Sequence, residues 1–194
     1  PPDHWPTKEW KSSPPEAQGL DGNLLNQLVG LIAEGEQYPD LHSLLVVRHG
    51  YLVIEEYFAG QEAGRSHTLQ SVSKSFTSAA VGIAIEEGLI SSLDDPVTAY
   101  IPELLERDSR FGKITLRHLL TMSSGIGFHR TSNPLHDGTK TYYAPDLRAI
   151  ALESRIEEPP GTRFQYNDYN PLLIGMVLER ATKMSVSEYL ETRL

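Results

Sequence analysis

Residues 69–90 read LQSVSKSFTSAAVGIAIEEGLI, and this stretch determines the interpretation of the whole chain. Its second half is rich in Ala, Val and Ile on nearly every side, which predicts a buried helix over residues 71–87. Gly88 follows at the position where a left-handed C-cap belongs. Ser71 and Lys74 stand three residues apart at the start of this helix, so their side chains are expected to lie on one face.

A serine and a lysine one helical turn apart suggest nucleophilic catalysis. A serine hydroxyl is a weak nucleophile until a base removes its proton, and Lys74 can serve as that base if its pKa is lowered. The outward-pointing N–H groups at a helix start could hold a developing oxyanion. The alternative is that Ser71 is an N-cap and Lys74 a solvated first-turn residue, because the Ser-x-x-Lys pattern is weak by itself.

Upstream of this helix, the sequence predicts an arm, a helix and a β-hairpin. Residues 1–20 are rich in proline, which disfavours helix and sheet, and carry two tryptophan rings for docking on the body. Asp21 precedes leucines at three-four spacing, which predicts an N-capped amphipathic helix ending near Gly35. Residues 41–48 and 51–58 are β-rich and flank the turn pair His49-Gly50, which predicts a hairpin.

Downstream, four helices are expected. Residues 115–121 and 145–152 form two short ones, Asn170-Pro171 is a start signal for a helix over 172–181, and Ser185 with Glu188 forms a capping box for the last. Residues 127–143 have loop composition and are too long for a plain connector. Tyr142 and Tyr143 at its end are candidates for lining a substrate groove, with a surface loop as the alternative.

Three ordered stretches resemble one known family. The first is residues 69–77 with 87–90 and 93–97, the second is ITLRHLLTMSSGI at residues 114–126, and the third is PGTRFQYNDYN at residues 160–170. Together they resemble the serine β-lactamases and penicillin-binding proteins. The similarity is greatest to the class C-like branch, which also holds carboxylesterases and 6-aminohexanoate-dimer hydrolases. Independent motifs in the right order make a chance match far less plausible than the tetrapeptide alone.

The resemblance implies a fold and a mechanism. The fold is α+β and serine β-lactamase-like: an antiparallel sheet flanked by helices, plus a helical region. Ser71 would attack a carbonyl to form an acyl-enzyme, Lys74 would be its general base, and Tyr166 would shuttle a proton to the leaving group. Tyr169 offers that last role in a shifted register.

One residue departs from the family pattern. Asp168 stands where the family usually carries Asn, so we expect it either to line the substrate site or to point elsewhere. A carboxylate beside Lys74 would favour the ammonium form of that lysine.

The same resemblance sets an expectation about chain length. After Tyr166, no strand with the family's final Lys-Thr-Gly or His-x-Gly element follows. We therefore expect the chain to stop before the C-terminal strands, with a companion polypeptide carrying that part. Residues 1–60 would hold the arm, first helix and hairpin, and residues 61–194 the nucleophile helix and helical region of the same domain.

Composition excludes several other classes. The 194 residues carry 17 Lys and Arg against 26 Asp and Glu, a net charge of −9 that argues against nucleic-acid binding. No apolar run is long enough for a membrane span, and the absence of Cys removes thiolate chemistry without fixing the compartment. His118 is expected to be a packed helix residue, and His129 and His136 loop residues. We expect no metal and no cofactor.

The expected function is hydrolysis of a small-molecule amide or ester, of the carboxylesterase or 6-aminohexanoate-dimer-hydrolase type. A β-lactamase or D-Ala-D-Ala carboxypeptidase is the alternative within the family. A non-catalytic ligand-binding or sensor module of the same fold is the alternative from another class, and Asp168 and the missing final element would both allow it.

Overall fold

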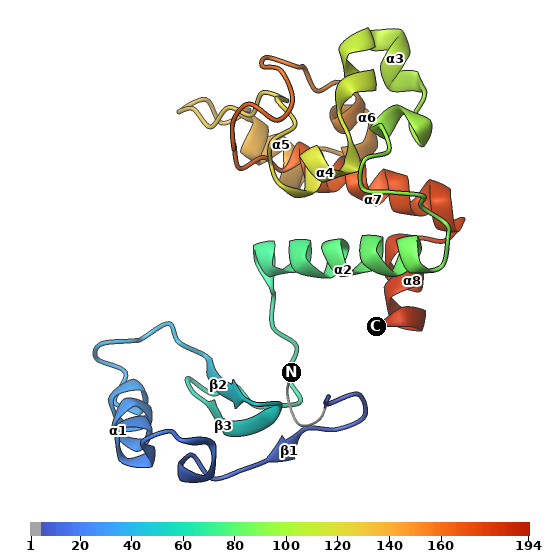
Figure 1. The fold of residues 1–194 in the computed structure, drawn as a ribbon. Helices are drawn as coiled ribbons and strands as arrows, with labels where there is room; N and C mark the ends of the chain where they lie inside the picture. Colours follow the sequence, from blue (N-terminus) through green and yellow to red (C-terminus); the bar gives the residue numbers. More distant parts are fainter. Residues whose placement is uncertain (1–4) are drawn as a thin grey trace. The chain divides into compact units, whose positions relative to one another are not determined.

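The computed structural model describes residues 5–194 and divides into two compact units, which meet in sequence at Thr68 and Leu69. Figure 1 shows the small sheet of the first unit and the helices of the second. The first unit contains β1 (Lys11–Ser12), a 3-10 turn (Glu16–Gln18), α1 (Gly22–Ala33), β2 (Ser43–Arg48) and β3 (Tyr51–Tyr57).

The predicted hairpin is confirmed, and a third strand joins it. β2 pairs antiparallel with β3, and both turn residues have positive φ, 51° at His49 and 86° at Gly50. Two positive φ values give the turn a twist that matches the right-handed twist of the strands. β1 pairs parallel with β3, so the strand order is β1-β3-β2.

The expectation that the proline-rich arm would form no sheet was therefore wrong over Lys11–Ser12, because these residues pair with β3. Residues 1–4 of the arm lie outside the described part of the chain. The two tryptophan rings are largely exposed, Trp5 at 70% and Trp10 at 52%. The helix that follows is confirmed, because the Asp21 carboxylate caps α1 by accepting hydrogen bonds from the backbone N–H groups of Asn23 and Leu24.

The second unit is helical in every regular element that the described residues form. These are α2 (Ser73–Glu86), α3 (Glu103–Arg107), α4 (Leu116–Leu120), α5 (Asp137–Tyr143), α6 (Leu147–Leu152), α7 (Tyr169–Thr182) and α8 (Val186–Arg193), with 3-10 turns at Gln70–Val72, Val97–Ala99 and Ser109–Lys113. In the part of the chain that the structure describes, no helix is long and apolar enough to cross a membrane.

Helix α7 forms the centre of this unit, and α2, α4, α6 and α8 all pack against it. Four of its apolar side chains are fully or almost fully buried: Leu173, Ile174, Val177 and Leu178. The predicted buried helix forms as α2, and within this unit Ala80, Val81 and Ala84 are its buried residues, while Phe76 is 44% exposed. The small residues let α2 lie close to α7.

Two further predicted helix boundaries are confirmed, the end of α2 and the start of α8. Gly88 has a φ of 73°, and Ser185 and Glu188 form both halves of the predicted capping box. The α7 start signal was misplaced, since the helix already includes Asn170, whose buried amide accepts a hydrogen bond from Ser124. Helix α5 was missed, because its polar sequence shows no apolar period to distinguish it from a loop.

Truncation in the α7 core provides a test of this packing. Replacing Leu178 with Ala removes a fully buried side chain and is expected to lower the free energy of unfolding by about 2–5 kcal/mol. Leu135→Ala is the matched control, because Leu135 is 70% exposed and should lose less than about 0.5 kcal/mol. Urea unfolding followed by circular dichroism measures both, and similar losses would contradict the assignment of the core.

Candidate active site

Ser71 lies in the 3-10 turn Gln70–Val72 that leads directly into α2. The turn is held by Ser73, whose hydroxyl donates to the Gln70 carbonyl at 2.8 Å. Gln70 itself has a φ of 48°, in the left-handed region that a side chain with a Cβ rarely adopts. An unusual backbone conformation therefore stands immediately before the serine.

Two polar side chains converge on the Ser71 hydroxyl. Lys74 Nζ donates to Ser71 Oγ at 3.2 Å, as the one-turn spacing predicted. Tyr166 OH donates to the same oxygen at 2.7 Å, although the two residues are 95 positions apart. Lys74 Nζ also lies 5.1 Å from the centre of the Tyr166 ring. The structure thus brings together all three residues that the sequence singled out for catalysis.

The Tyr166 segment is held in place by the loop that follows α4. Gly161 N donates to the Ser123 carbonyl at 2.7 Å, and Gln165 N donates to that of Met122 at 2.8 Å. Close approach requires glycine here: Gly125 has a φ of 76°, and a Cβ on it would lie 2.0 Å from the Glu158 carbonyl oxygen. The second and third family-like stretches are therefore packed directly on each other.

Asp168 points at Lys74. Its Oδ1 lies 2.8 Å from Lys74 Nζ, and its Oδ2 lies 3.4 Å from Arg130 Nη2. Asp168 is only 6% exposed, so most of its charge must be compensated by these two cations. Of the two possibilities that the sequence left for this residue, the structure has the carboxylate in the site, against the lysine.

The shared contacts displace two pKa values in opposite directions. Burial alone would lower the pKa of Lys74, but the hydrogen bonds to Asp168 and Tyr166 outweigh it and raise that pKa. Burial would raise the pKa of Tyr166, but the hydrogen bonds with Lys74 and Ser71 outweigh it and lower that pKa. The resting site therefore favours the ammonium form of Lys74. The phenol of Tyr166 is more acidic than that of a free tyrosine.

Tyr169 does not reach this cluster. Its hydroxyl donates to Asp137 Oδ1 at 2.9 Å, and burial together with that carboxylate raises its pKa. The ring itself packs edge-on against Phe128. The shifted-register alternative for the catalytic tyrosine is thus not what the geometry offers.

Tyr142 and Tyr143 lie on α5, beside the serine turn. The Tyr142 hydroxyl is 3.4 Å from Gln70 Oε1, and both tyrosines line an open cavity of about 520 Å³. Arg130 also lines it. The sequence did not single out Arg130, because it lies in an irregular loop outside any motif. Gln70 falls within the first family-like stretch, but its contact with Tyr142 and its positive φ could not be predicted from the sequence.

The histidines have structural partners. His118 completes a capping box with Thr115 at the start of α4, and His129 Nε2 lies 2.8 Å from Glu157 Oε1. His136 caps α5, so the sequence His136-Asp137-Gly138 matches His-x-Gly in letters but begins a helix rather than a strand. Within residues 5–194, no group of three or more His, Cys, Asp or Glu side chains could hold a metal ion.

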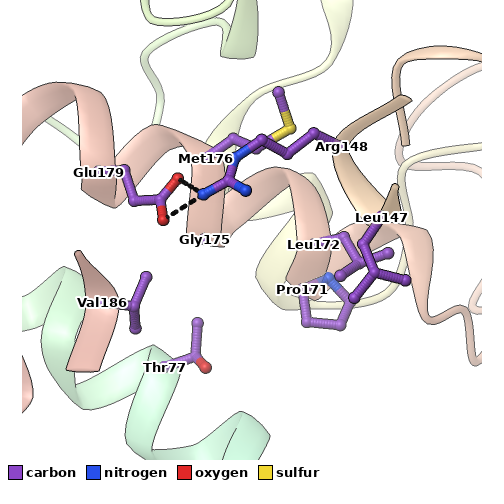
Figure 2. A pocket seen from close by; sticks show the side chains of 9 residues that line it. All are labelled: Thr77, Leu147, Arg148, Pro171, Leu172, Gly175, Met176, Glu179 and Val186. Atoms are coloured by element: carbon purple, nitrogen blue, oxygen red, sulfur yellow. Dashed lines mark hydrogen bonds and ion pairs between the residues drawn. The ribbon is translucent and has the colours of Figure 1, made fainter. Parts of the chain in front are cut away.

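A second cavity, of about 270 Å³, lies elsewhere on α7 (Figure 2). Its wall is largely apolar and includes Leu172 and Met176, with the ion pair between Arg148 and Glu179 along one side. Neither Ser71, Lys74 nor Tyr166 lines it. By contrast, Gln70, the residue immediately before Ser71, lines the cavity beside α5.

The chain matches known proteins over most of its length. The Beta-lactamase family model covers residues 32–194, and the chain belongs to that family. Esterase EstB of Burkholderia gladioli is 31% identical over 158 residues, which make up 71% of this chain and 40% of that protein. Protein flp of Staphylococcus aureus strain MW2 is 25% identical over 157 residues, 76% of this chain and 31% of that protein.

The solved structures agree in fold. A putative 6-aminohexanoate-dimer hydrolase from Bacillus anthracis superposes with a TM-score of 0.66 at 26% identity, covering 79% of this chain and 43% of that one. The chain is thus a serine β-lactamase-like α+β protein of the hydrolase family that includes esterases, as the sequence predicted. It spans between about a third and a half of the length of these relatives.

The contact between Lys74 and Asp168 can be tested by stability. Lys74→Met leaves the Asp168 carboxylate poorly compensated and should cost about 2–3 kcal/mol of unfolding free energy, less than a fully buried pair because the lysine side chain is 20% exposed. The double variant Lys74→Met/Asp168→Asn removes that charge and should recover to within about 1 kcal/mol of the unaltered protein. Urea unfolding at pH 7 measures both variants. A double variant that loses at least as much unfolding free energy as Lys74→Met alone would contradict the ion pair.

Proposed function

We propose that this protein is a serine hydrolase that cleaves an ester or amide through an acyl-enzyme on Ser71. The observation that carries the proposal is the convergence of Lys74 Nζ and Tyr166 OH on Ser71 Oγ. A nucleophile with a proton acceptor at hydrogen-bond distance, itself oriented by a third group, is the arrangement that nucleophilic catalysis needs. The likeness to Esterase EstB and to a putative 6-aminohexanoate-dimer hydrolase supports an ester or linear amide as substrate.

The directions of the two pKa shifts favour Tyr166 as the proton acceptor. The family resemblance had implied Lys74 as that general base. Lys74 stays an ammonium beside Asp168 and stabilises the phenolate form of Tyr166. In the phenolate form, Tyr166 accepts the hydroxyl proton of Ser71 across the 2.7 Å contact as the serine oxygen bonds to the substrate carbonyl carbon.

The rest of the cycle returns that proton. The tetrahedral intermediate collapses, the bond to the leaving alcohol or amine breaks, and Tyr166 gives its proton to that leaving atom. This step leaves Ser71 acylated. A water molecule then attacks the acyl carbon while Tyr166 accepts a proton from it, the bond to Ser71 Oγ breaks, and the proton passes to that oxygen. The carboxylic acid product leaves and the site is regenerated.

Covalent labelling tests the nucleophile. A fluorophosphonate should add once to the full protein, and peptide mass spectrometry should find the adduct on Ser71. Ser71→Ala should abolish the label, because no other oxygen in the described site contacts both Lys74 and Tyr166. Ser75→Ala is the matched control, one helical turn along on exposed α2 surface, and should label as before.

Two results would overturn this proposal. A label that survives Ser71→Ala would place the nucleophile elsewhere. A protein that binds esters but forms no adduct with them or with the fluorophosphonate would instead be a ligand-binding or sensor module of the same fold.

The pH dependence of acylation tests the proton acceptor. Only the phenolate can accept the serine proton, so the acylation rate should rise with pH and level off above the pKa of Tyr166, which lies below the usual value of about 10. Tyr166→Phe should remove this rise and slow acylation by about 10²–10⁴-fold. Stopped-flow release of 4-nitrophenol from an ester between pH 6 and 10 measures it, with Tyr38→Phe as a control. A rise that persists in Tyr166→Phe would return the base to Lys74.

A further inference from the structure

The open cavity beside the serine turn has an unusual wall for an acidic protein. It measures about 520 Å³ and runs from Gln70, next to Ser71, to Arg130 and the tyrosines of α5. Gly138 keeps one side open, since a Cβ there would lie 3.0 Å from the His136 ring and 3.4 Å from Arg130 Nε. Because Gln70 directly precedes Ser71, a substrate whose carbonyl sits at Ser71 would have this space beside it.

The charge on the wall has one sign. Among the described residues that line the cavity, Arg130 carries the only permanent charge and none is a carboxylate, although the whole chain has a net charge of −9. The neighbouring acid Asp137 is engaged elsewhere: its carboxylate accepts hydrogen bonds from the Tyr169 hydroxyl and the His129 backbone N–H. The cavity therefore presents a positive potential with hydroxyl and amide groups around it.

Most of the N–H donors of Arg130 have no hydrogen-bond partner among the described residues. A guanidinium carries five N–H groups, and in the described structure only Nη2 has a partner, Asp168 at 3.4 Å. Asp168 is closer to Lys74, at 2.8 Å, so its charge is mainly compensated there. The Arg130 side chain is 60% exposed and its guanidinium carbon lies 5.6 Å from the centre of the Phe128 ring, which supports it without using its N–H groups.

We propose that this cavity binds a carboxylate-bearing arm of the substrate, held by Arg130. The inference rests on the proposed function, because it names the class of ester or amide that the Ser71 site accepts: one with a free acid group on the arm that enters the cavity. A guanidinium matches a carboxylate through two parallel N–H···O bonds, which a neutral arm cannot reproduce. The Tyr143 hydroxyl adds a donor at the same wall, while that of Tyr142 donates to Gln70 Oε1.

The test compares two esters of equal reach on the full protein. One is the 4-nitrophenyl monoester of adipic acid, which is anionic at pH 7; the other is its methyl ester, which is neutral. The unaltered protein should show a kcat/KM at least about tenfold higher for the anionic ester, as expected for a charge-assisted hydrogen bond. Added salt should reduce this ratio, because the contact is partly exposed.

Variants at Arg130 identify the group responsible. Arg130→Gln should bring the ratio of the two kcat/KM values close to one, and Arg130→Lys, which keeps the charge but not the paired donors, should keep only part of it. Lys113→Gln is the matched control: it removes an exposed cation of the same unit that does not line the cavity, and should leave the ratio unchanged. A ratio that Arg130→Gln does not change, or that Lys113→Gln lowers equally, overturns the inference.

Binding separates this inference from the proposed function. Calorimetry measures both esters on Ser71→Ala and on Ser71→Ala/Arg130→Gln, where no acylation is expected. If the unaltered protein hydrolyses neither ester but Arg130→Gln weakens binding of the anionic one alone, the proposed function fails and the anion site stands. If binding does not distinguish the two esters, the anion site fails whatever the hydrolysis shows.

Discussion

The ion pair between Lys74 and Asp168 is the contact on which the chemistry of the site depends. It joins the first turn of α2 to the residue that precedes α7, so it ties the two helices together where the reactive atoms lie. It also keeps a positive charge next to the Tyr166 phenol, which lowers the pKa of that phenol and, in the proposed mechanism, favours Tyr166 as the proton acceptor. Asp168 stands where the family usually carries Asn, and in this geometry its carboxylate favours the ammonium form of Lys74.

Features of the fold that depend on neighbouring residues could be predicted from the sequence. The Asp21 cap, the His49-Gly50 turn and the Ser185 capping box each follow from chemistry within four positions. Strand β1 and helix α5 could not be predicted in the same way. The two-residue strand β1 is specified by its pairing with Tyr51–Leu52 rather than by its own composition. The sequence of α5 has no apolar periodicity that would predict a helix.

The same distinction applies to the site. The contact of Ser71 with Lys74 follows from helical spacing, whereas that of Ser71 with Tyr166 joins residues 95 positions apart and could be expected only through the family resemblance. The direction of the Asp168 carboxylate and the position of Arg130 depend on how the loop after α4 packs, which no local pattern encodes. The pKa shifts of Lys74 and Tyr166 follow from these non-local contacts, because neighbouring charges and hydrogen bonds set the pKa values.

The left-handed backbone of Gln70 has a consequence for how such a protein loses activity. A residue with a Cβ adopts this conformation at a cost of about 1–2 kcal/mol, and it persists only while the surrounding packing enforces it. Mild heat or denaturant that loosens the turn would let Gln70 relax, and the hydroxyl of Ser71 would then turn away from its two partners while the α7 core stayed intact. Loss of activity would accordingly precede global unfolding, and the protein would pass through a state that is folded but inactive.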